Sequence, residues 1–199
     1  MSRVLGGSLA LVMAILVLPA LVAADDKSDK DKNRVVYWPT PQEVVDEMLK
    51  MAKVSKDDVL YDLGCGDCRI PVTAALKYKC KAFGYDIDPD RIKDSEENIK
   101  KNKVGDLVTV KKQDIFADDF DVSKATVVTL YLLPNLNVEL IPKLEKLKDG
   151  CRIVSHDFDM EGVKPKEVKT MTAKRHDGVE GDHKIFLWVT PLQKEKKKQ

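Results

Sequence analysis

A short apolar segment followed at once by closely spaced glycines constrains the fold more than any other feature of this 199-residue chain. Residues 59–63 read Val-Leu-Tyr-Asp-Leu, which is typical of a short buried strand with an acid near its end. Gly64 and Gly66 follow directly, and a helical pattern begins near Arg69. A strand, a glycine turn and a helix in this order bring backbone N–H groups up to a nucleotide-like ligand. The segment therefore predicts a site for such a ligand.

A second acid stands at the spacing that suits a ribose. The segment 83–88 reads Phe-Gly-Tyr-Asp-Ile-Asp and looks like another strand that ends in an acid. Asp86 lies 20 residues after Gly66, and a carboxylate about 20 residues past such glycines can grip a ribose diol. The dinucleotide fingerprint also needs a third glycine, but Arg69 occupies that position. The pattern thus predicts a ribose-containing ligand other than a dinucleotide.

The charges beside the glycine turn indicate which nucleotide fits. Asp62 and Asp67 flank the turn and would repel a phosphate, whereas they suit a cationic amine. S-adenosylmethionine carries such an amine, a sulfonium and a ribose diol, and it has no phosphate. The string Asp-Leu-Gly-Cys-Gly-Asp-Cys from Asp62 to Cys68 resembles motif I of class I methyltransferases, roughly D-x-G-x-G-x-G. The resemblance covers residues 37–190, and Cys68 stands where the family usually has its last glycine.

Predicted strands and helices alternate through most of the chain. A capping box at residues 40–43 opens the first helix, whose apolar face runs to residue 52. The alternation predicts a doubly wound, mostly parallel, Rossmann-like α/β sheet of about seven strands with an antiparallel closing strand. The strands are expected at 59–63, 81–86, 107–111, 125–132, 150–156, 167–173 and 184–189, and the later helices at 70–78, 89–102 and 136–146.

The candidate cofactor residues follow from the rule that open α/β sheets bind ligands beyond the carboxyl ends of their strands. Asp114 would accept a hydrogen bond from the adenine amino group, and Ile87 and Ile115 would pack on the ring. Asp88 is expected instead to cap the helix that begins at residue 89. With the resemblance, the full set for S-adenosylmethionine is Tyr37, Thr40, Asp62, Leu63, Gly64, Gly66, Asp86, Ile87, Asp114 and Ile115.

Two residues are the candidates for catalysis. Tyr131 ends the predicted fourth strand and can face the transferred methyl group. His156 ends the fifth predicted strand and forms, with Asp157, a His–acid pair beside the predicted site, where a general base would act on a protonated acceptor. The histidines show no metal-ligand spacing, so no metal site is expected. The Asn- or Asp-Pro-Pro-aromatic sequence of many N-methyltransferases is absent after residue 130, which disfavours adenine amines of nucleic acids as acceptors.

The segment Tyr37-Trp38-Pro39-Thr40-Pro41 resembles the one that precedes motif I in a subset of protein-lysine methyltransferases outside the SET class. The resemblance implies that this segment closes over the cofactor and that the acceptor is a protein lysine. A small-molecule acceptor and a catalytically degenerate binding module are the alternatives. A further alternative is an exported thiol–disulfide protein that uses Cys65 and Cys68. We expect a monomer.

The ends of the chain differ from its middle. Residues 1–24 combine Arg3 with an apolar run, so they read as a signal peptide cleaved after Ala24, or else as an uncleaved anchor. Residues 25–34 read as a disordered linker, 35–192 as the methyltransferase domain and 193–199 as a basic tail. This predicts an exported or, alternatively, a membrane-anchored protein. Without Arg3, the 33 remaining basic residues equal the 33 acidic ones, so no nucleic-acid partner is expected.

Overall fold

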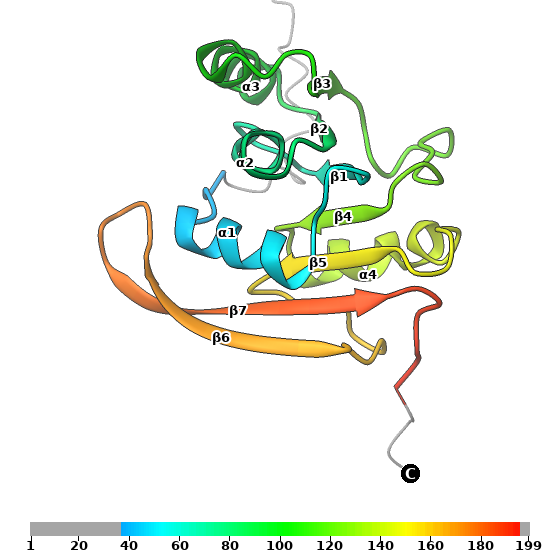
Figure 1. Cartoon of the computed structure of the whole chain (residues 1–199). Coiled ribbons are helices and arrows are strands. Elements are labelled where there is room, and N and C mark those ends of the chain that lie inside the picture. The colour runs from blue at the N-terminus through cyan, green and yellow to red at the C-terminus, as the bar shows by residue number, and fades with distance from the viewer. Residues whose placement is uncertain (1–36, 196–199) are drawn as a thin grey trace, which may run out of the picture. The chain divides into compact units, whose positions relative to one another are not determined.

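A seven-stranded sheet with the strand order β3-β2-β1-β4-β5-β7-β6 forms the centre of the computed structural model, which describes residues 37–195 (Figure 1). Strands β1 to β5 pair in parallel, and β7 pairs antiparallel with both β5 and β6. The predicted Rossmann-like fold is therefore confirmed. The elements are α1 (Gln42–Met51), β1 (Val59–Leu63), α2 (Arg69–Tyr78), β2 (Lys81–Asp86), α3 (Pro89–Asn102), β3 (Val108–Lys112), β4 (Val127–Leu130), α4 (Pro134–Leu144), β5 (Arg152–His156), β6 (Glu167–Lys174) and β7 (Glu180–Val189).

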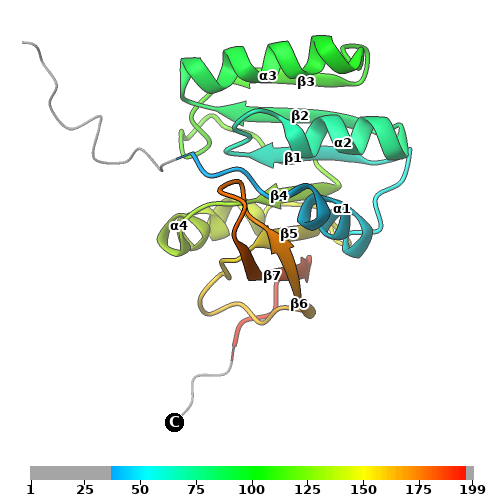
Figure 2. The same cartoon turned by 90° about the vertical axis from the view of Figure 1, so that its left-hand side faces the viewer.

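Helices cover both faces of the sheet. Alternate residues of a strand point to opposite faces, so Leu60 belongs to one apolar cluster with Val45 and Leu49 of α1. Tyr61 belongs to the other cluster, with Leu140 of α4. Figure 2 looks onto the face that carries α1, α2 and α3, while α4 lies behind the sheet. Burial on both faces explains why the central strands read as nearly continuous apolar runs.

Element boundaries agree with the sequence pattern to within about two residues, except that β7 begins at Glu180 where the pattern predicts residue 184. The start of α1 differs in how it is capped. Strand β2 and helix α3 have the expected bounds, and Asp88 caps α3 by accepting a hydrogen bond from the Asp90 amide. The predicted capping box is wrong: Pro41 is the N-cap residue of α1 and no side chain caps this helix. The Thr40 hydroxyl lies instead 3.1 Å from Nδ1 of His156.

The ends of the described region bear on three predictions. The signal peptide or anchor and the linker lie outside the described residues, so they and the exported location stay predictions. The basic tail begins in contact with the domain, because the Lys164 amide donates to the Gln193 carbonyl and the Glu195 amide to the Gly162 carbonyl. Within residues 37–195, no helix has the length and apolar character needed to cross a membrane.

Candidate active site

The glycine turn after β1 has a backbone that few residues other than glycine adopt. Gly64, Gly66 and Cys68 have φ angles of +81°, +55° and +59°. The amides of Gly64 and Cys65 both donate to the carbonyl of Tyr85 in β2, at 2.9 and 3.0 Å. The turn is thus fastened to the neighbouring strand, and Cys68 takes the left-handed conformation expected of the glycine it replaces, at an energetic cost.

Gly84 of β2 makes room for the two cysteines of the turn. A Cβ atom at this position would overlap Sγ of Cys68 and would lie 2.8 Å from Sγ of Cys65. Both thiols are free and buried. The hydrogen bond with Cys68, together with burial, raises the pKa of Cys65 far above its usual value, so the thiol stays protonated. These thiols pack the turn onto the sheet, and a glycine inside a strand is the sequence signal of such a close approach.

Asp62 is a buried carboxylate at the end of β1. Its residue is 3% exposed, and its Oδ1 accepts a hydrogen bond of 2.6 Å from the hydroxyl of Thr129, its register partner on β4. Burial raises the pKa of Asp62 to about 7, and the charges of Asp67 and Asp86 act in the same direction. Among the described residues no cation pairs with it, so an ammonium group placed here would relieve the cost of burying the charge.

Asp86 at the end of β2 is held in place by backbone amides. Its Oδ2 accepts from Gly66 at 2.9 Å and its Oδ1 from Asp88 at 3.0 Å. A carboxylate oxygen can accept more than one hydrogen bond, so an oriented acceptor remains for the hydroxyls of a ribose. Ile87, the next residue, is 52% exposed and presents an apolar side chain at the edge where the adenine contact is predicted.

Helix α3 supports the glycine turn through two residues that sequence reasoning missed. The buried Ser95 hydroxyl donates to the Gly66 carbonyl at 2.7 Å, and the Asn98 amide donates to the Asp67 carbonyl at 2.8 Å. These bonds satisfy carbonyl groups that a tight turn would otherwise leave without partners. Polar residues on a charged helix give no sequence signal of this role.

The segment 37–41 lies over the turn. A Cβ atom at Gly66 would come 2.5 Å from Cε2 of Tyr37. Arg69 makes two hydrogen bonds to the carboxylate of Asp67, at 2.9 and 2.7 Å, and donates another to the Thr40 carbonyl at 2.9 Å. Burial raises the pKa of Asp67, but the hydrogen bonds and the positive charge of Arg69 outweigh it and hold this pKa below its usual value. Tyr37 therefore lies beside the predicted site, while Thr40 is turned toward β5.

The remaining predicted cofactor residues differ in how accessible they are. Asp114 is exposed and accepts a hydrogen bond from the Phe116 amide at 2.8 Å. Ile115 is 6% exposed and belongs to the apolar cluster under the sheet, as does the side chain of Leu63. Ile87 is thus the accessible apolar side chain of this group, and the assigned roles of Asp114 and Ile115 stay predictions.

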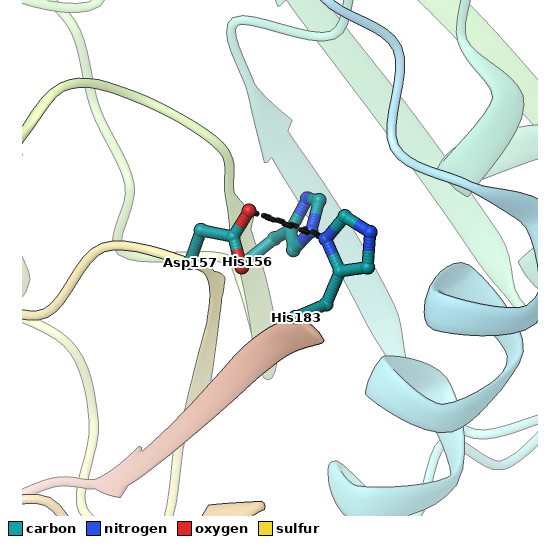
Figure 3. Close-up of side chains that lie close together, drawn as sticks. All are labelled: His156, Asp157 and His183. Atoms are coloured by element: carbon teal, nitrogen blue, oxygen red, sulfur yellow. Dashed lines mark hydrogen bonds and ion pairs between the residues drawn. The ribbon is translucent and has the colours of Figure 1, made fainter. Parts of the chain in front are cut away.

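A histidine cluster lies at the end of β5, beside the predicted acceptor side. His156 is fully buried, and its ring centroid is 4.0 Å from that of Tyr131. Its Nε2 lies 2.9 Å from Nδ1 of His183, and Oδ2 of Asp157 lies 3.3 Å from both of these nitrogens (Figure 3). Burial, and to a smaller extent His183, lower the pKa of His156 to about 4. The ring of His156 is fully buried, so an acceptor could not reach it without a change in the surrounding side chains. A catalytic role of His156 stays a prediction.

These residues fit the cofactor that motif I implies. The buried carboxylate of Asp62 can hold its amine, the oriented carboxylate of Asp86 its ribose, and the exposed side chain of Ile87 its adenine. The glycine turn lies between them, at the carboxyl edge of the parallel strands, which is where α/β sheets bind ligands.

Similar proteins indicate the same cofactor and the same type of reaction. A family model described as the ANTKMT methyltransferase domain matches residues 62–167. A curated protein-lysine N-methyltransferase from Saccharolobus islandicus is 48% identical over 157 residues, which are 78% of this chain and 93% of that protein. A solved RNA methyltransferase from Salinibacter ruber, in complex with S-adenosyl-L-homocysteine, is 42% identical with a TM-score of 0.69, over 80% of this chain and 97% of that one. A ribosomal protein L11 methyltransferase from Acinetobacter baumannii is 30% identical over 57% of this chain but only 36% of its own length.

The fold and the site together define a class I methyltransferase that uses S-adenosylmethionine. More specifically, the chain belongs to the ANTKMT methyltransferase family.

Proposed function

We propose that this enzyme transfers a methyl group from S-adenosylmethionine to the side-chain amine of a lysine in a protein. Methyl transfer is supported by two carboxylates at the ends of adjacent strands. Asp62 is buried at the end of β1, and Asp86 is held by backbone amides at the end of β2. The protein-lysine acceptor is supported by the relative from Saccharolobus islandicus, whose length the chain covers almost completely.

The protein contributes mainly alignment. When bound, S-adenosylmethionine supplies a methyl group activated by its sulfonium. Asp62 holds the amine of the cofactor and Asp86 holds its ribose. The ring of Tyr37 covers Gly66 and limits access of water there. Orientation of this kind can contribute about 7–11 kcal/mol to a displacement reaction.

The acceptor side offers exposed aromatic rings suited to the apolar stem of a lysine. Tyr37 and Trp38 are 36% and 39% exposed, and Trp38 stacks on His176 of the β6–β7 turn at 4.7 Å. Tyr131 is half-buried at the end of β4. We assign the acceptor to the space beyond these rings, with Tyr131 as the residue that contacts the reacting groups and His156 as a positioning residue behind it.

RNA is the second candidate acceptor. It is favoured by the likeness to the Salinibacter ruber RNA methyltransferase. The balance of acidic and basic residues argues against it, because a nearly neutral chain has little electrostatic attraction for phosphates.

Radiolabelled S-adenosylmethionine tests the proposal. The full chain is incubated with a cell protein extract, with the same extract after chemical acetylation of its lysines, and with total RNA. We expect label in the untreated protein alone, on lysines located by mass spectrometry, and markedly less label with an Asp62→Asn variant when the S-adenosylmethionine concentration lies below the wild-type Kd. Label in RNA, or equal label after acetylation, would contradict a lysine acceptor. Binding of the cofactor without any transfer would indicate a degenerate module.

A further inference from the structure

We propose that His156, Asp157 and His183 form a binding site for a divalent transition cation such as Zn²⁺. Two imidazoles and a carboxylate are a donor set that suits first-row transition metals better than Mg²⁺ or Ca²⁺. His156 and His183 are 0% and 3% exposed, so a cation here would be largely enclosed by protein. Figure 3 shows the three side chains pointing toward a common centre from β5 and β7.

The distances between the three donor atoms match those around one metal ion. The two nitrogens are 2.9 Å apart, and Oδ2 of Asp157 is 3.3 Å from each of them. A cation about 2.1 Å from all three atoms would make angles of about 90° between the nitrogens and about 105° between each nitrogen and the oxygen. These angles fall between octahedral and tetrahedral geometry.

Protons alone account poorly for this arrangement. One N–H can lie between the two ring nitrogens, and the remaining electron pairs of nitrogen and carboxylate then face each other at 3.3 Å, with both imidazoles buried and the Asp157 side chain 27% exposed. The outer nitrogen of His183, Nε2, is buried with no partner among the described residues. A cation in the centre would satisfy all three inward-facing electron pairs at once.

The neighbours of the cluster orient its donor atoms. Thr40 Oγ1 lies 3.1 Å from Nδ1 of His156, where it can accept the N–H that a metal-bound histidine carries on its other nitrogen. The Lys184 amide donates to Oδ1 of Asp157 at 2.9 Å, which leaves Oδ2 to face the imidazoles. Asp157 also has a φ of +57°, a strained backbone of the kind that gathers at functional sites. His156 ends β5, Asp157 follows it and His183 lies within β7, so the cation would join these strands to the segment 37–41 through Thr40.

The three ligands are distinct from Asp62 and Asp86, which are assigned to S-adenosylmethionine, so cation binding and cofactor binding can be measured separately. Full-length protein is stripped with a chelator and titrated with Co²⁺, whose absorption spectrum reports its ligands, and then with Zn²⁺ by calorimetry. The variants are Asp157→Asn, which keeps the shape and tolerates the left-handed backbone, and His183→Phe. His176→Asn, at the histidine outside the cluster, is the matched control. Affinity for S-adenosylmethionine is measured on every sample to verify folding.

We expect wild type and His176→Asn to bind one cation per chain with a nitrogen- and oxygen-type spectrum. Asp157→Asn and His183→Phe should each weaken binding at least about 100-fold. Absence of saturable binding to the wild type, or equal binding by either variant, would overturn the inference without touching the proposed methyl transfer. A thiolate-type spectrum that disappears in a Cys65→Ser, Cys68→Ser double variant would assign the cation to the thiols and would equally overturn it.

Discussion

At the scale of single residues, Asp62 combines a cost to the stability of the fold with the proposed role in binding the cofactor amine. Its pKa is about 7 in the folded chain against 3.8 for a model carboxyl, because burial disfavours the charged form. The carboxyl contributes to stability below pH 4, and that contribution is lost as pH rises through 7, where the folded protein must hold a buried negative charge. A bound amine would offset this loss.

Asp62→Asn should therefore stabilise the free protein and weaken the cofactor complex. The gain in unfolding free energy should approach an upper limit of about 4 kcal/mol at pH 8 and shrink toward zero near pH 4. Urea unfolding at a series of pH values measures it, with Asp106→Asn, an exposed acid in the turn before β3, as control. Affinity for S-adenosylmethionine should fall at least about tenfold, the value of a hydrogen bond to a charged group. A variant that is less stable than wild type at pH 8 would contradict the account.

Cys68 carries backbone strain that a matched pair of substitutions can measure. Cys68→Gly and Cys68→Ala both remove the packed thiol, but glycine alone adopts a φ of +59° at no steric cost. We expect Cys68→Gly to be more stable than Cys68→Ala by roughly 1 kcal/mol, with cofactor affinity kept in both. Denaturant unfolding and calorimetry provide the measurements. Equal stability of the two variants would remove the case for strain.

At the scale of elements, the site depends on how closely the glycine turn approaches β2. Gly84 lies between the turn's thiols and the strand, and its φ is not in the left-handed region. An added methyl group is therefore a test of space alone, without a backbone effect.

Gly84→Ala should destabilise the protein by about 1–3 kcal/mol, as overpacking of a core does. Thermal unfolding measures the effect, and Gly105→Ala is the control because its nearest side-chain atom, on Ile99, is 4.0 Å away from the new Cβ. Combining Gly84→Ala with Cys68→Ala should recover part of the loss, because the two residues share the same space. Additive losses would show that the thiol of Cys68 is not the obstacle.

Elements were predictable from the sequence where the signal is local. The apolar run, the glycines and the acid at residue 86 lie within one strand–turn–helix–strand unit, and β2 and α3 have the bounds that their patterns predict. Thr40 shows the opposite case. The local pattern predicts that its hydroxyl caps a helix, but the hydroxyl contacts His156, which is 116 residues away in the sequence. The strand order alone brings that partner close.

At the scale of the whole molecule, the sheet decides which distant residues meet. His183 lies next to His156 only because β7 pairs antiparallel with β5, and no spacing along the chain reveals this. The same holds for Thr129, which meets Asp62 through the register of β4 on β1. The sequence predicts the class of fold, which the structure confirms, and it predicts a cofactor site at the carboxyl ends of the strands. The hydrogen-bond partners of each acid, in contrast, are seen only in the structure.

Calorimetric titration with S-adenosylmethionine tests most directly whether the cofactor binds at the carboxyl ends of β1 and β2. Wild type, Asp86→Ala and a control, Asp106→Ala, are compared at pH 8. Asp106 precedes β3 and so lies at the amino ends of the parallel strands, whereas Asp86 lies at the carboxyl end of β2. We predict saturable binding to wild type and control, and an affinity lower by about 10- to 100-fold in Asp86→Ala, since hydrogen bonds to a charged carboxylate contribute about 1.5–3 kcal/mol. Binding by Asp86→Ala as tight as that of wild type would contradict the account.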